Sequence, residues 1–184
     1  MALPVAIDGV RAIAERYDGF ILDMWGVLHD GQHPYPGVVD CLTRLKRAGK
    51  RLVVLSNAPR RVEPATRRMA EIGIDPALID AMMTSGEDAW RHLKARIDPW
   101  YARLGRACFH LGPERDKGML EGQDMDVVQD IARADFILNT GADHDDDRVE
   151  TYAPLLAQAR RRNLPMICAN PDLVVVHRGR LAIC

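Results

Sequence analysis

The first part of the chain alternates short apolar runs with amphipathic segments, and this alternation restricts the possible fold more than any other feature. Runs at 20–24, 51–55 and 81–85 have the length of strands, and the first, which glycines bound, suits a strand buried on both faces. Between them, 38–48 and 62–72 carry apolar residues at helical spacing and end at glycines. Strands joined by helices through short connections pair in parallel, so the sequence predicts a doubly wound parallel α/β sheet.

The pattern changes after residue 86, where a second and smaller α/β region is expected as an insert. We predict a core at 1–86, the insert at 87–163 and a return of the chain to the core sheet at 164–184. The remaining expected elements are a short helix at 5–16, a helix around 90–97, strands at 107–111, 125–128 and 135–139, a helix at 149–159 and a strand within 165–172.

Composition narrows the class of protein. The 184 residues are 47% hydrophobic and 28% charged, which is typical of a globular chain. A net charge of −1 gives no electrostatic reason to expect a nucleic acid or an anionic membrane as partner. No apolar run reaches the roughly 18 residues of a membrane span, and the N-terminal residues do not resemble a signal peptide. Four scattered cysteines favour reduced thiols, so we expect a cytoplasmic protein.

Polar residues follow the predicted strands at their carboxyl ends, which share one edge of a parallel sheet. Asp23 follows the first strand, and Ser56 and Asn57 follow the second. A carboxylate here can act as a nucleophile or metal ligand, Gly26 allows a sharp turn, and hydroxyl and amide groups suit phosphate oxygens. Because a carboxylate repels phosphate, such a site needs a cation such as Mg²⁺. The alternative is that Asp23 caps a turn and that Ser56 and Asn57 are ordinary loop residues.

The ordered motifs resemble one family in particular. ILDMWGVLHDG at 21–31 resembles motif one of the haloacid dehalogenase superfamily, and VVLSNAPR at 53–60 resembles its motif two. Together with MTSG at 83–86 and ANPD at 169–172, they resemble subclass IIA, which carries its cap after the third strand. HLGPERDKGML and the D-x-W-G form of motif one are similar to one bacterial subgroup. The resemblance extends through essentially the whole chain.

This resemblance implies a Mg²⁺-dependent phosphatase for a small phosphorylated metabolite, such as a sugar phosphate or a nucleotide. Asp23 would be the nucleophile and a metal ligand, and the backbone carbonyl of Trp25 a second ligand. Ser56 and Asn57 would hold the phosphoryl group, with Gly26 turning the backbone beneath it. Residues 87–163 would be a cap that selects the substrate. The resemblance also implies that Asn170 and Asp172 line the cleft, and that the protein can form a homodimer.

Trp25 departs from the family pattern, which has an aspartate here that protonates the leaving group and later deprotonates water. An indole can do neither, because its N–H only donates. Losing an acid–base group typically costs about 10²–10⁴-fold in rate, so we expect slow turnover or a persistent phosphoenzyme. His29, Asp30 and His33 are candidate substitutes, or simply residues of a polar loop. The alternative function is that of a non-catalytic relative, which binds a phosphorylated ligand without hydrolysing it. A nucleotide-binding Rossmann domain is disfavoured, because no GxGxxG motif follows the first strand.

The end of the sequence is a second departure. Motifs three and four of the family, which supply a lysine and acidic metal ligands, normally follow the region where this sequence stops. The final LVVVHRGRLAIC is expected to contain no helix and no further strand. We therefore interpret the 184 residues as a C-terminally truncated fragment, with weak metal affinity and little or no activity when it is isolated.

Overall fold

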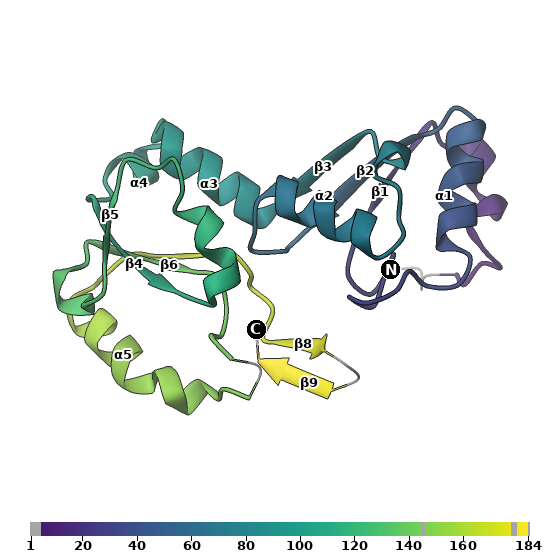
Figure 1. Ribbon diagram of the computed structural model, residues 1–184. Coiled ribbons are helices and arrows are strands. Elements are labelled where there is room, and N and C mark those ends of the chain that lie inside the picture. Colours follow the sequence, from purple (N-terminus) through teal and green to yellow (C-terminus); the bar gives the residue numbers. More distant parts are fainter. Residues whose placement is uncertain (1–4, 145, 178–179, 184) are drawn as a thin grey trace. The chain divides into compact units, whose positions relative to one another are not determined.

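The computed structural model describes residues 5–144, 146–177 and 180–183 as a mixed α/β chain (Figure 1). Its strands are β1 Gly19–Leu22, β2 Arg51–Ser56, β3 Ala81–Thr84, β4 Ala107–Leu111, β5 Asp126–Val128, β6 Phe136–Asn139, β7 Met166–Cys168, β8 Val174–His177 and β9 Arg180–Ile183. The α-helices are α1 Val38–Arg47, α2 Val62–Glu71, α3 Ser85–Ala95, α4 Pro99–Ala102 and α5 Val149–Arg161. Parallel strands joined by helices confirm the predicted α/β class.

The chain divides into two compact units, and it passes between them more than once. The first unit comprises residues 1–56 and 66–83. The second comprises 57–65 and 84–184, so the short segment after β2 groups with the second unit. The predicted boundaries at 86 and 163 stay a prediction. In the described part of the chain, no helix has both the length and the apolar character that a membrane span requires.

A sheet with the order β1-β2-β3 forms the centre of the first unit. β1 and β2 are parallel, with Ile21 opposite Val53. One face of β2 is buried through Leu52 and Val54, as expected for residues that alternate along a strand. On the other face, Ile21 is 74% exposed and Leu55 is 54% exposed. The expectation that the first strand is buried on both faces is therefore wrong for the described residues, because Phe20 and Leu22 are partly buried whereas the face that carries Ile21 is uncovered.

The predicted helix at 5–16 is also wrong. Two single 3₁₀ turns, Val10–Ala12 and Ala14–Arg16, occupy this segment. Gly9 has φ 136°, which is far from helical backbone, so a continuous helix cannot run through this residue.

The second unit contains a parallel sheet with the order β5-β4-β6-β7. Helices cover both faces, with α3 and α5 on opposite sides of the sheet (Figure 1). Phe136 and Leu138 pack with Leu93 of α3, whereas Ile137 between them packs with Ala159 of α5. This alternation explains why β6 is an uninterrupted apolar run, since both of its faces are buried.

Two expectations for residues 164–184 require correction. Met166–Cys168 forms a strand as expected, but it pairs in parallel with β6 of the second sheet and does not return to the first one. The reason is topological, because β6, α5 and β7 form one strand–helix–strand unit whose parallel strands are neighbours. The expectation of no further strand is wrong as well, because β8 and β9 form an antiparallel pair. The sequence contains a signal for this hairpin, namely the β-branched residues Val174, Val175 and Val176 shortly before Gly179.

Candidate functional site

Asp23 lies directly after β1, at the carboxyl end of the strand, and its side chain is exposed. Its Oδ1 accepts a hydrogen bond from the backbone N–H of Met24 at 2.7 Å. The following loop is anchored because Met24 and Leu28 are both buried and the Leu28 N–H donates to the Met24 carbonyl at 2.9 Å. Gly26 turns the chain with φ 81°, a conformation that favours glycine. The loop therefore holds one carboxylate at the strand tip and leaves its second oxygen atom accessible.

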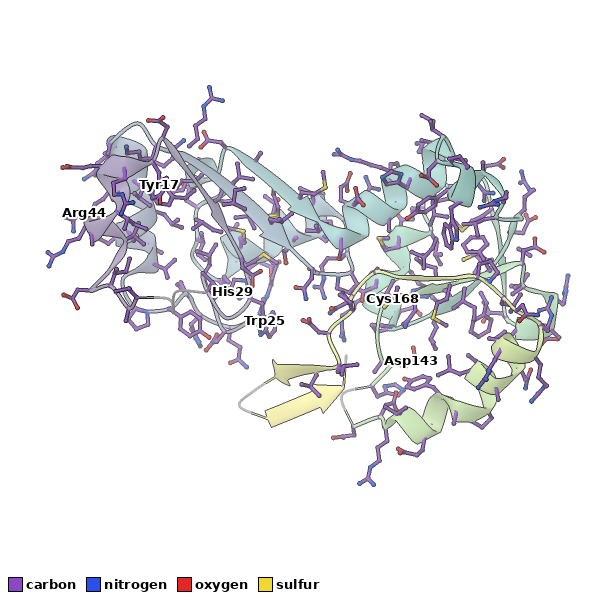
Figure 2. All side chains as sticks on the ribbon, turned by 180° about the vertical axis from the view of Figure 1, so that it is seen from behind. Tyr17, Trp25, His29, Arg44, Asp143 and Cys168 are labelled. Atoms are coloured by element: carbon purple, nitrogen blue, oxygen red, sulfur yellow. The ribbon has the colours of Figure 1, made fainter. Side chains whose placement is uncertain are left out.

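Trp25 packs against its own loop, as Figure 2 shows for the labelled Trp25 and His29. The two rings meet edge to face, with their centroids 5.6 Å apart. The indole also covers Gly31, where an added Cβ would lie 2.3 Å from Trp25 Cη2. Gly31 is therefore required both by this contact and by its φ of 93°. The indole side chain is part of the packing that shapes the loop after Asp23.

His29 is the most buried titratable side chain of this loop, with 2% of its surface exposed. Its Nδ1 accepts from the Gly31 N–H at 2.9 Å, which leaves the proton of a neutral ring on Nε2. That Nε2 is buried and has no hydrogen-bond partner among the described residues. Burial lowers the pKa of His29, although the nearby carboxylates of Asp30 and Asp23 oppose this shift. The structure thus favours a neutral imidazole.

Asp30 and His33 belong to a neighbouring turn. Asp30 Oδ1 accepts from the backbone N–H groups of Gln32 at 2.8 Å and His33 at 2.7 Å. These hydrogen bonds, first that of His33 and then that of Gln32, lower the pKa of Asp30. An aspartate that receives two amides two and three residues ahead is typical of a turn, which is the ordinary loop role considered above.

Ser56 and Asn57 are adjacent in the sequence but belong to different units. Ser56 ends β2 and is buried, and it belongs to the first unit together with the loop that follows Asp23. Asn57 belongs to the second unit, where its Nδ2 donates to Asn170 Oδ1 at 3.3 Å and to Asp172 Oδ2 at 2.5 Å. The structure therefore brings Asn57 together with Asn170 and Asp172, each of which is more than 100 positions away from Asn57 in the sequence.

The predicted metal ligands are the Asp23 carboxylate and the Trp25 carbonyl. Mg²⁺ takes six oxygen ligands and commonly uses one or two carboxylates, with phosphate oxygens and water at the other positions. The described residues contain no group of three or more histidine, cysteine or acidic side chains that could hold a metal ion. The two oxygen donors fit Mg²⁺ in kind, but one carboxylate implies weak affinity until a phosphate contributes its own oxygens.

A separate cavity of about 400 Å³ lies within the second unit. It opens beyond the carboxyl ends of β4 and β5, and the loop after β6 also lines it. Polar side chains include His110, Lys117 and Gln129, and apolar surface comes from Phe109 and Val127. Ligands of parallel sheets bind outside these strand ends, and the lining of this cavity suits an organic group of mixed polarity.

Sequence reasoning missed a buried acid next to the third strand end. Glu87 is 5% exposed, and it interacts with the guanidinium groups of Arg61 and Arg91. The available signal was the pattern Thr84-Ser85-Gly86-Glu87, which matches a helix capping box. In the structure Thr84 does cap α3, accepting from the Glu87 N–H at 3.0 Å, but the Glu87 carboxylate bonds to the segment after β2.

Comparison with known proteins identifies the family of this chain. The model of the haloacid dehalogenase-like hydrolases matches residues 20–126. The chain belongs to this family. Human chronophin is 31% identical to it over 127 residues, which are 68% of this chain and 43% of chronophin. The chain thus spans less than half the length of this curated relative.

Solved structures of haloacid dehalogenase-like proteins support the same assignment. A hydrolase of this family from Brucella suis 1330 is 30% identical, with a TM-score of 0.85 over 98% of this chain and 66% of that one. The 4-nitrophenylphosphatase of Thermotoga maritima is 25% identical, with a TM-score of 0.66 over 93% of this chain and 61% of that one. With chronophin, these matches confirm the expected haloacid dehalogenase family and its subclass IIA.

Proposed function

We propose that the protein is a Mg²⁺-dependent phosphatase that hydrolyses a small phosphorylated metabolite, such as a sugar phosphate or a nucleotide. The observation that carries the proposal is Asp23, an exposed carboxylate fixed at a strand tip within the region that the family model matches. The names of relatives agree with this chemistry, since they include a 4-nitrophenylphosphatase and the chicken glycerol-3-phosphate phosphatase.

In the proposed reaction, an oxygen of the Asp23 carboxylate attacks phosphorus, and the bond between phosphorus and the leaving oxygen breaks. The leaving oxygen takes a proton from solvent water, and a water molecule then attacks phosphorus, which breaks its bond to the Asp23 oxygen, releases inorganic phosphate and restores the carboxylate. Ser56 and Asn57 would donate hydrogen bonds to the phosphoryl oxygens. For Asn57 this donor would be the backbone N–H, because the two hydrogens of its side-chain amide already bond to Asn170 Oδ1 and Asp172 Oδ2. Asp23 and the Trp25 carbonyl would hold Mg²⁺, which supplies positive charge that reduces the repulsion between carboxylate and phosphate.

A second candidate function rests on Trp25. Its indole occupies the position where the family resemblance implies an acid–base carboxylate, and it packs into the loop. A relative that binds a phosphorylated ligand without turnover would keep the Asp23 loop and the hydrogen bonds of Asn57 and still lack this group. The same ligand chemistry serves both functions, so only turnover separates them.

The test uses the protein expressed from the complete reading frame, with 4-nitrophenyl phosphate as a generic substrate. We expect slow release of nitrophenol with Mg²⁺, loss of release after EDTA, and recovery when excess Mg²⁺ is added. Ligand binding without any release over many hours would favour the non-catalytic alternative. Release that EDTA leaves unchanged would contradict the Mg²⁺-dependent mechanism.

The insert predicted at 87–163 would select the substrate, and the cavity beside His110 and Lys117 offers it surface of mixed polarity. We propose a cytoplasmic location, which the free thiols of Cys41, Cys108 and Cys168 support. A homodimer is also proposed, on the family resemblance alone.

A further inference from the structure

The segment 57–62, here called the phosphate loop, is held by the residues that lead from β3 into α3. The Gly86 N–H donates to the Ala58 carbonyl at 3.1 Å, and the Ser85 hydroxyl shares its one hydrogen between the Ala58 carbonyl, at 3.1 Å, and the Ala169 carbonyl. The Thr84 hydroxyl donates to the Arg60 carbonyl at 2.6 Å. Three consecutive residues therefore hold the loop backbone at two carbonyl groups, although the two segments are about 26 positions apart in the sequence.

Gly86 makes this contact possible through its lack of a side chain. An added Cβ would lie 2.4 Å from the Arg60 nitrogen, 2.6 Å from the Arg60 oxygen and 2.6 Å from the Pro59 carbonyl carbon. All three neighbours are backbone atoms, which cannot rotate away as the end of a long side chain can. A larger residue at this position must therefore displace the phosphate loop or the start of α3.

Glu87 fastens the other end of the loop. Its carboxylate accepts from Arg61 Nε at 2.5 Å and Nη2 at 3.3 Å, and from the backbone N–H of Val62 at 3.3 Å. Arg91 on α3 donates to the same carboxylate at 2.9 Å. The Arg61 guanidinium also lies over the Trp90 ring, 3.6 Å from its centroid. The buried acid therefore links the end of the loop, the first turn of α2 and α3.

We propose that Gly86 and Glu87 are positioning residues of the phosphate loop, which they hold so that the backbone N–H of Asn57 can donate to the phosphoryl group. This inference rests on the function proposed above. It assigns to the β3–α3 junction a task beyond connecting two elements, namely fixing the geometry of substrate phosphate binding. A displacement of about 1 Å in such a group can cost about 10²-fold in rate.

The charge of Glu87 gives the junction a defined pH dependence. Hydrogen bonds from Arg61, and then from Arg91 and Val62, lower the pKa of Glu87 to about 2, against the effect of its burial. An acid with a lowered pKa stabilises the fold above its ordinary pKa near 4.5 and loses this contribution as the pH falls toward 2. We expect the difference in Tm between the wild type and Glu87→Gln to be largest at neutral pH and to shrink below pH 4.5. A difference in Tm that stays constant down to pH 2 would contradict this role of the Glu87 charge.

The deciding experiment compares Glu87→Gln and Gly86→Ala with matched controls in the complete protein. Asp88→Asn is the control for charge, because Asp88 is exposed on the same helix, and Gly118→Ala is the control for volume, because its added Cβ meets no atom within 4 Å. Hydrogen exchange of the Val62 and Gly86 backbone amides measures how stable the hydrogen bonds between the loop and the β3–α3 junction are, and it does not depend on activity. The KM for 4-nitrophenyl phosphate and the inhibition constant of inorganic phosphate report phosphate binding.

We expect faster exchange at both amides in the two variants and a rise in KM and in the inhibition constant of about 10-fold to 100-fold, with both controls near the wild type. Glu87→Gln keeps the test valid if Gly86→Ala does not fold. Unchanged hydrogen exchange, or a lower kcat with an unchanged KM and inhibition constant, would overturn the positioning role. The proposed function would still stand in that case, provided that the wild type is active. A wild type that neither turns over the substrate nor binds phosphate would instead refute the proposed function.

Discussion

Replacing Asp23 with asparagine is expected to reduce phosphatase activity by at least about 10³-fold, because an amide cannot serve as the nucleophile. The fold should tolerate the change. Asparagine keeps the oxygen that accepts the Met24 N–H, so the local hydrogen bond at 2.7 Å can persist. The side chain is exposed, so no buried contact is lost. Steady-state release of nitrophenol and the Tm of both proteins provide the measurement.

Asp40→Asn is a suitable control for Asp23→Asn. Asp40 is an exposed carboxylate on α1 that makes only a long ion pair with Arg44, 3.5 Å between the charged atoms. We expect this variant to retain activity. If Asp23→Asn retains the rate of the wild type as well, the assignment of Asp23 as the nucleophile is wrong.

Replacing Trp25 with aspartate is expected to raise the rate by about 10²–10⁴-fold, because it restores a group that can protonate the leaving oxygen and activate water. The backbone carbonyl of residue 25, the proposed metal ligand, is unchanged by the substitution. The loop retains its hydrogen bonds from Gly26 to His29 and from Leu28 to Met24, although the ring contact with His29 is lost. Single-turnover kinetics would show whether the gain lies in formation or hydrolysis of the phosphoenzyme.

Trp25→Asn separates the chemical effect from the loss of the indole. Asparagine has nearly the shape of aspartate, but it cannot exchange a proton with the leaving group or with water. We expect Trp25→Asn to stay as slow as the wild type. Equal gains in the two variants would mean that the indole obstructs the site, and no gain in either would refute the missing-acid argument.

Local periodicity predicted the first unit well because its elements are short, regular and bounded by glycines. The helix expected at 38–48 is α1 Val38–Arg47, and the strand expected at 51–55 is β2 Arg51–Ser56. Periodicity could not predict that Met166–Cys168 would join β6, since strand pairing depends on partners far along the chain. It also overlooked Gly9, whose backbone conformation prevents the expected helix.

The candidate site was predictable only in part for a similar reason. Asp23 and Ser56 were expected from their places at strand ends, and both follow or end the strands that were predicted. The family resemblance implied that Asn170 and Asp172 line the cleft, but their hydrogen bonds with Asn57 were not predicted, since no local pattern connects residues so far apart. Glu87 was missed because its partner Arg61 lies 26 positions away and a single acid on a helix usually faces solvent.

The division of the chain at residues 56 and 57 has a consequence for engineering this family. Here the second unit includes 57–65 as well as 84–184, and its sheet requires β7 beyond the predicted end of the insert. A graft limited to 87–163 would separate Glu87 from Arg61 and β6 from its neighbour. A chimera that keeps the second unit intact should therefore transfer both segments, because the Arg61–Glu87 ion pair joins 57–65 to 84–184.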